Sequence, residues 1–462
     1  MAKIAYKWRV MITVVFGGWM ISLDTTVINV AFPTLRREFG AGIDEAQWVI
    51  SVYVLALGIA TPLAGFLCDR FTIKRMYIAG LSVFVIGSLL CGLAPGLTPL
   101  IAARALQGFG GGIAQPLGVA MIFMAFPPEE QGRAFGIFGL VMVVAPALGP
   151  MLGGVLADRE LWRWIFFINI PVGIVGIIFA SRLLRVKEQK RSKPFNPLSI
   201  ITAVIGVASI LYATSVVNHY GWSSNVVIGS FVLGVVALSA FTIVDLRFTE
   251  APLLELRLFR KRTFLKANLI GYLAVLALFG ADFLLPIYLQ SLRGLTATQS
   301  GIILLPLAIT AGLMNPVAGR LYDKLGPRPL VVTGSILLLI NTWQFAHLAI
   351  DTPISQILVL LVLRGLAISS IMQATLTSAL SKVTRRGLPR GSSLVNSTRF
   401  VVQALGVALL ATVLSSAFSH EENLRGFEQA YKITFYAALV ALLMGLRLPG
   451  WPGNWTVRGA KK

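Results

Sequence analysis

An aspartate stands alone in each of two long apolar stretches, and an arginine stands alone in each of two others. Asp24 and Asp282 lie 258 residues apart, and Arg104 and Arg364 lie 260 apart. An ionised aspartate at the centre of a membrane costs about 2.5–3.5 kcal/mol. Asp24 must therefore face a water-filled cavity, pair with a cation such as Arg104, or be protonated. Because burial favours the neutral carboxyl and a nearby arginine favours the charged one, such a pair suits a proton carrier. The alternative is a static ion pair that holds helices together.

A charged loop motif occurs twice. GFLCDRFTIKR occupies 65–75, and GRLYDKL repeats its beginning 254 residues later, with Asp323 at the position of Asp69. Gly65 permits close helix contact, Asp69 can bind the end of a neighbouring helix, and Arg70 stays outside the membrane. We interpret the loop as a latch on a gate. The alternative is anchoring by positive charge alone, which accounts for the basic residues but not for Asp69.

The apolar run at 134–157 is rich in glycine and proline. Glycine lets helices pack closely, and proline removes a backbone hydrogen bond and bends the helix. We therefore predict a hinge at Gly149, Pro150, Gly153 and Gly154. The alternative is ordinary packing of small residues.

Candidates for a substrate cavity share a polar or aromatic side chain inside an apolar run: Trp19, Asn29, Gln115, Gln290, Asn315, Asn341 and Gln373. Amides among flexible apolar groups suit an amphipathic organic molecule better than a sugar or an inorganic ion. The three histidines lack metal-ligand spacing, and the sequence has no HExxH, GxSxG or phosphate-binding loop. We predict no metal, no cofactor beyond protons as the coupling ion, and no enzymatic activity.

Long apolar elements must position these residues. The chain has 462 residues, is 56% hydrophobic and only 13% charged, and has a mean hydropathy of +0.79. These values exclude a soluble globular enzyme and a disordered chain. A spanning helix needs about 20 apolar residues. We predict fourteen spans, at 10–33, 47–68, 76–94, 98–126, 134–157, 163–183, 198–217, 224–245, 265–289, 297–318, 329–349, 354–378, 391–417 and 430–447.

The basic residues predict the orientation. Thirty of the 40 Lys and Arg lie on one set of alternate segments between the spans, and this set includes both termini. Seven lie on the other set of segments, and Arg104, Arg364 and Arg399 remain inside spans. The positive-inside rule then places both termini in the cytoplasm. Topology accounts for the net charge of +21 without nucleic acid. The first apolar run has no cleavage site and is predicted to be a retained span.

The repeated features argue for two homologous halves, because four of them recur in order at offsets of 254 to 260 residues. We predict six-helix bundles at 1–183 and 265–462, the second including a cytoplasmic tail. Between them, 184–264 would be a linker with two inserted spans. Its segment 248–263 is amphipathic and is predicted to lie on the membrane surface, although a short solvated connector is the alternative. The two-half repeat suits alternating access better than a channel.

Five motifs in order resemble the major facilitator superfamily, and specifically its fourteen-spanner drug:proton antiporter family. They are LDTTVINVAFP (23–33), GFLCDRFTIKR (65–75), RALQGFGGG (104–112), the glycine series of the fifth span, and WRWIFFINIPVG (162–173). The resemblance covers nearly the whole chain. It implies an all-α membrane protein of two six-helix bundles plus a two-helix insert, with a rocker-switch exchange of substrate against inward proton flow.

The resemblance also assigns roles to residues. It implies proton coupling by Asp24 and Arg104, gating by Asp69 and Arg70, and an antiport bend at Gly149-Pro150. One departure is Thr72, which stands where the loop motif usually has glycine and predicts a tighter or less mobile turn. The other is that spans 10 to 14 contain no acidic residue, which argues against broad specificity for cationic drugs.

These observations predict a proton-coupled antiporter of a bacterial inner membrane that exports amphipathic or hydrophobic small molecules. The alternative is an exporter or flippase of lipid or glycolipid with the same fold, which would need a lateral opening. We expect a monomer that contacts membrane lipids and its substrate but no nucleic acid.

Overall fold

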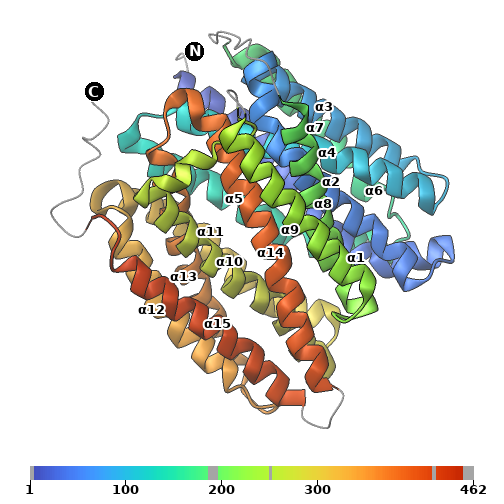
Figure 1. The fold of residues 1–462 in the computed structure, drawn as a ribbon. Coiled ribbons are helices and arrows are strands. Elements are labelled where there is room, and N and C mark those ends of the chain that lie inside the picture. Colours follow the sequence, from blue (N-terminus) through green and yellow to red (C-terminus); the bar gives the residue numbers. More distant parts are fainter. Residues whose placement is uncertain (1–4, 186–195, 249–251, 419–422, 451–462) are drawn as a thin grey trace.

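A computed structural model describes residues 5–185, 196–248, 252–418 and 423–450. Its described part is a bundle of long helices joined by short loops (Figure 1). Eleven helices are long and apolar enough to cross a membrane. Three more, α5, α10 and α15, are of comparable length and run beside them, which makes fourteen spans. The prediction of an all-α polytopic protein is confirmed.

The N-terminal half contains α1 (Tyr6–Phe39), α2 (Ile43–Phe71), α3 (Ile73–Gly92), α4 (Leu97–Ala125), η1 (Pro128–Glu130), α5 (Gln131–Asp158), α6 (Trp164–Phe167) and α7 (Asn169–Leu183). The insert contains α8 (Pro197–Tyr220), α9 (Asn225–Arg247) and η2 (Leu256–Arg260). The C-terminal half contains α10 (Arg262–Ile287), the π-helical turn η3 (Tyr288–Leu292), α11 (Ala297–Leu325), α12 (Pro327–Ala346), α13 (Ile354–Ser381), η4 (Arg385–Gly387), α14 (Leu388–Phe418) and α15 (Asn423–Gly445). The short α6 and α7 together make one span, Trp164–Leu183.

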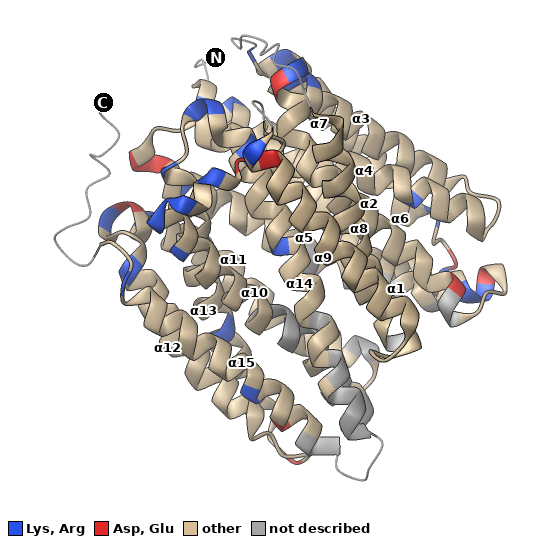
Figure 2. Cartoon of the chain, viewed as in Figure 1, with Lys and Arg blue, Asp and Glu red and all other residues tan. Residues whose placement is uncertain are grey.

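Lys and Arg gather at the end of the bundle where α1 begins and α15 ends, which we call the basic end (Figure 2). A single apolar cluster at this end includes residues from both halves, such as Phe123 and Phe135 with Leu380 and Leu394. At the opposite end each half has an apolar cluster of its own. The two halves are therefore packed together at the basic end, and the described residues form no such shared core at the other.

Two seams join the halves. Helix α5 packs closely along α11, and α2 contacts α14. The inserted helix α8 lies against the second seam, because it contacts both α2 and α14. Tyr212 of α8 stacks on Trp48 of α2, with ring centroids 6.0 Å apart, while Val217 of α8 clusters with Ala408 of α14. Helix α9 packs mainly on α8 and is the more peripheral of the two.

The segment after α9 differs from its prediction. Leu253, Leu254 and Leu258 are 2%, 5% and 5% exposed and belong to the apolar cluster shared by the two halves. Asp245, at the end of α9, fixes this segment by accepting hydrogen bonds from the Leu253 amide (2.8 Å) and the Ser199 hydroxyl (2.7 Å). The prediction that its apolar side lies on the membrane surface was wrong, since the leucines find a protein surface to cover.

Candidate functional site

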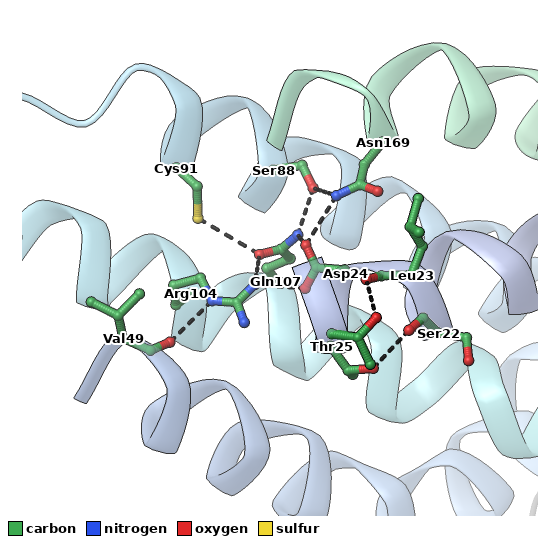
Figure 3. A network of polar contacts seen from close by, with 11 residues as sticks. Ser22, Leu23, Asp24, Thr25, Val49, Ser88, Cys91, Arg104, Gln107 and Asn169 are labelled. Carbon is green, nitrogen blue, oxygen red and sulfur yellow. Dashed lines mark hydrogen bonds and ion pairs between the residues drawn. The ribbon is translucent and has the colours of Figure 1, made fainter. Parts of the chain in front are cut away.

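Asp24 and Arg104 form an ion pair inside the N-terminal half (Figure 3). The Arg104 Nη1 donates to Asp24 Oδ2 over 2.6 Å, and the residues are 0% and 2% exposed. Asp24 lies in the middle of α1. Arg104 lies in α4 and is the first residue of the RALQGFGGG motif. Of the three environments predicted for Asp24, the described structure has the second, pairing with a cation.

Three neutral side chains complete the surroundings of the carboxylate. Gln107 Nε2 donates to Asp24 Oδ1 over 2.8 Å, and Asn169 Nδ2 donates to the same oxygen over 3.0 Å. Ser88 accepts from both amides, at 2.6 Å from Gln107 and 3.3 Å from Asn169. Figure 3 shows these side chains converging on Asp24 from α3, α4 and α7. The guanidinium and the two amides donate to the carboxylate, and Ser88 holds both amides in place.

Arg104 ties α2 to the same network. Its Nε donates to the Val49 carbonyl over 3.1 Å, and its guanidinium lies 4.1 Å from the ring centroid of Tyr53. Five helices thus meet at one ion pair. Protonation of Asp24 would remove the counter-charge of Arg104, and every helix that holds the pair would experience the change.

Sequence reasoning missed Gln107, Asn169 and Ser88 as members of this site. Gln107 and Asn169 stand inside two of the motifs quoted above, RALQG and FFINIP. The signal was a polar side chain within an apolar span, which also occurs at many positions that only pack. The sequence does not show which face of a helix meets Asp24, so these residues could not be distinguished from polar residues that only pack.

Arg364 occupies the corresponding position in the C-terminal half. Its Nη1 donates to Asn341 Oδ1 over 3.1 Å, and its Nη2 donates to the Ala277 carbonyl. Asn341 in turn donates to the Leu360 carbonyl over 2.6 Å and is 0% exposed. Asn341 is therefore a buried partner of Arg364 in this conformation, and its role as a cavity residue stays a prediction. The side chain of Asp282 lies outside the described part of the chain.

Each repeated loop motif contacts the other half at the basic end. Asp323 Oδ1 and Oδ2 accept hydrogen bonds from the backbone N–H groups of Gly132 and Arg133, each over 2.8 Å. This carboxylate thus binds the beginning of α5, where a helix is partly positive. Asp69 forms an ion pair with Arg390, at the beginning of α14. A Cβ added to Gly65 would meet the backbone of Arg390, 2.7 Å from its Cα.

The motif order, the duplicated helix bundles and these crossed contacts define a family. The profile of the Major Facilitator Superfamily matches residues 14–407. The chain belongs to this superfamily. The resemblance to its fourteen-span branch is confirmed, and the chain is a multi-pass membrane transporter, not an enzyme.

Curated relatives of this transporter cover nearly its whole length. The lincomycin resistance protein LmrB of Bacillus subtilis is 32% identical over 420 residues, which are 90% of this chain and 88% of that protein. The multidrug resistance protein B homolog of Mycobacterium tuberculosis is 32% identical over 411 residues, 88% of this chain and 76% of that protein. The crystal structure of the human organic anion transporter MFSD10 shares the fold, with a TM-score of 0.72, 14% identity and coverage of 95% of this chain and 99% of that one.

The predicted hinge of the transporter lies where α5 packs on α1. A Cβ on Gly149 would collide with the Thr26 side chain, two residues after Asp24. At the other end of α5, a Cβ on Gly136 would meet the backbone of Asn315 and Pro316 in α11. Small residues thus let α5 touch both halves closely. Gly153 is buried in the same helix, while the side chain of Pro150 and the surroundings of Gly154 lie outside the description.

The remaining cavity candidates fall in different places. Asn315 and Gln373 lie between the halves, where Gln373 donates to the Gly132 carbonyl over 2.9 Å. Trp19 and Gln115 are partly buried, with Trp19 Nε1 and Gln115 Oε1 bonded to no described group. Gln290 is exposed on the π-helical turn. The side chain of Asn29 is outside the description. Arg70 is exposed beside Phe71.

Thr72 joins α2 to α3 with φ 78° and ψ 147°, and its counterpart Gly326 joins α11 to α12 with φ 81° and ψ −177°. Glycine adopts this conformation readily, whereas a β-branched residue is strained there. We expect Thr72→Gly to raise the free energy of unfolding by about 1 kcal/mol, and Gly326→Thr to lower it by a similar amount. Thermal unfolding of the purified transporter would measure both. Equal Tm values for Thr72→Gly and the wild type would contradict strain at this turn.

Proposed function

We propose that this transporter exports amphipathic or hydrophobic small molecules in exchange for protons, by alternating access between its two halves. The observation that carries the proposal is the buried ion pair of Asp24 and Arg104, held by five helices of one half. A carboxylate that is buried, paired and surrounded by donors can bind a proton only if its surroundings rearrange. Protonation and a change of helix packing are thereby linked, as coupling requires.

We also propose that the basic end faces the cytoplasm, in agreement with the positive-inside rule. The apolar cluster shared by both halves and the contacts of Asp69 and Asp323 all lie at this end. In this conformation the cytoplasmic side is closed. A substrate released from it would leave toward the other face of the membrane, which is the direction of export.

The relatives guide the substrate class. Curated relatives are named for resistance to lincomycin and for multidrug transport, which supports a small organic substrate. A lipid substrate would need a route from the bilayer between the halves. Helix α8 lies against the seam between α2 and α14, and α5 packs closely along α11 at the other seam, so the described contacts favour a small molecule that enters from water.

Proton movement in proteoliposomes with a preset pH gradient tests the proposal. A pH-sensitive dye reports flux as lipophilic cations, neutral amphiphiles and lipid-like compounds are added one at a time. Substrate-triggered flux in the wild type, lost in Asp24→Asn, is the expected result. Flux of equal size in Asp24→Asn would contradict the coupling role, and the absence of flux with every compound would contradict proton antiport.

The cytoplasmic contacts predict a gating effect. Asp323→Ala removes two hydrogen bonds to a charged acceptor, each worth about 1.5–3 kcal/mol. We expect the open-inward state to gain population by about tenfold or more, because the contact exists only when this side is closed. A cysteine introduced at Ala134, which is 1% exposed, with Cys68 and Cys91 replaced by alanine, would react faster with a maleimide. Asp351→Ala, an exposed carboxylate outside the latch, is the matched control, and equal labelling rates would argue against the latch.

A further inference from the structure

Three arginines lie deep within the spans, and one of them is paired with a carboxylate in the described part of the chain. Arg104 is paired with Asp24. Arg364 donates to Asn341 and to the Ala277 carbonyl. Arg399, in the middle of α14, makes one long hydrogen bond, from its Nη2 to the Thr375 hydroxyl over 3.4 Å. The transport mechanism above gives Arg399 no role.

The surroundings of Arg399 are polar but neutral. Its Nη2 would lie 3.1 Å from a Cβ on Gly271 of α10, so the guanidinium is directed toward α10 and α13 within its own half. The nearby Tyr272 hydroxyl donates to Thr398 over 2.6 Å and is already engaged. The Nε of Arg399 is buried and bonded to none of the described groups.

No carboxylate in the described part of the chain forms an ion pair with Arg399. Helices α12, α13 and α14 contain neither Asp nor Glu. Among the described side chains, Arg399 therefore has no counter-charge at this depth.

An unpaired charge inside a membrane is costly, so such residues mark sites where a partner arrives from outside. A partner that arrives from outside the protein can also reach Arg399. It is partly exposed, whereas Arg104 and Arg364 are 0% and 1% exposed. An arginine presents a planar fork of donors that suits two oxygens of one acidic group. A cationic substrate would instead meet a like charge.

We propose that Arg399 binds an acidic group of the transported molecule, a carboxylate, sulfonate or phosphate, and that the substrates are therefore amphipathic anions. The Thr375 hydroxyl, which Arg399 already contacts, lies beside this position. The inference rests on the proposed function for its physiological meaning, but binding of an anion at Arg399 is measurable without transport.

Equilibrium binding of three dansyl compounds tests the inference. Dansylglycine, dansylglycinamide and N-(2-aminoethyl)dansylamide share one fluorophore and end in a carboxylate, a neutral amide and an ammonium group. The purified full-length protein in phosphatidylcholine vesicles is titrated with each, and protein-free vesicles supply the background. We expect the wild type to bind the carboxylate about tenfold more tightly than the amide, the effect of one charge-assisted hydrogen bond.

Variants then assign the preference to Arg399. Arg399→Gln should lose it while still binding the amide, and Arg399→Lys should keep most of it. Arg182→Gln removes an exposed charge at the end of α7 and should behave as the wild type. Because Arg399 lacks a counter-charge, Arg399→Gln should not lower the Tm. Equal binding of carboxylate and amide by the wild type, an unchanged preference in Arg399→Gln, or a lower Tm with loss of all three ligands would overturn the inference.

The acidic group could belong to a free amphiphile or to a lipid headgroup. Vesicles that also contain phosphatidylglycerol separate these sources. Weaker dansylglycine binding in such vesicles by the wild type, but not by Arg399→Gln, would identify a lipid phosphate as an occupant of the site. Unchanged binding would identify a free amphipathic anion. A preference for the carboxylate without proton flux would leave Arg399 as an anion site and refute only the proposed antiport.

Discussion

Asp24→Asn is expected to abolish proton-driven transport while leaving the protein folded. The substitution removes the group that binds a proton but keeps its shape. Asn169 donates to Asp24 in the wild type. In the variant its amide can rotate, so that its oxygen accepts a hydrogen bond from the asparagine introduced at position 24, and the polar groups of the site can still be paired. Proton flux in proteoliposomes should fall to the level of empty vesicles, and the protein should stay folded with a lower Tm, because Arg104 keeps a buried charge without its partner.

The control for this variant is Asp351→Asn, which removes an exposed carboxylate far from the ion pair. It should transport at the wild-type rate. Substrate accumulation by Asp24→Asn against a concentration gradient, driven by a pH gradient, would show that another group carries the proton. Downhill exchange that persists in Asp24→Asn would agree with the coupling role, because alternating access does not itself require the carboxylate.

Arg104→Met is expected to destabilise the folded transporter by about 3–5 kcal/mol, the cost of leaving a buried charge without its partner. Asp24 would keep the amides of Gln107 and Asn169 but lose the guanidinium. The N-terminal half would also lose the bond from Arg104 to the Val49 carbonyl. Thermal unfolding in detergent should show a lower Tm, and Arg182→Met is the matched control for loss of an arginine.

The double variant Asp24→Asn/Arg104→Met separates charge from packing. If the unpaired carboxylate causes the loss, replacing it by asparagine should restore much of the Tm. A double variant as unstable as Arg104→Met would show that the contacts of Arg104 with Tyr53 and Val49 matter more than its charge. Either Tm can be compared with transport, because Asp24→Asn alone is expected to be inactive but folded.

Much of the architecture could be predicted because a membrane demands long apolar runs. The fourteen spans, the duplicated halves and the pairing of Asp24 with Arg104 all depend on features that stand out against an apolar background. The carboxylates Asp69 and Asp323 stand out in the sequence for the same reason, and their role as a latch stays a prediction. Their contact partners were not predictable, because no sequence feature at the beginning of α14 or of α5 indicates that a carboxylate from the other half binds there.

The remaining differences concern which surface an amphipathic or polar residue faces. Asn341 was predicted to line a cavity, and in this conformation it holds Arg364 inside the C-terminal half. The leucines of the segment after α9 could satisfy either a lipid or a protein surface, and the choice depended on Asp245 fixing the backbone of Leu253. Helical periodicity alone does not identify the neighbour that a face will meet.

The position of α8 has a mechanical consequence. It touches α2 of one half and α14 of the other, so it could not move rigidly with both if the halves rock as proposed. One of these contacts would then slide in every transport cycle, with α9 packed on the sliding helix. Turnover should therefore respond to bilayer thickness and lateral pressure, and the membrane itself becomes a component that sets the rate.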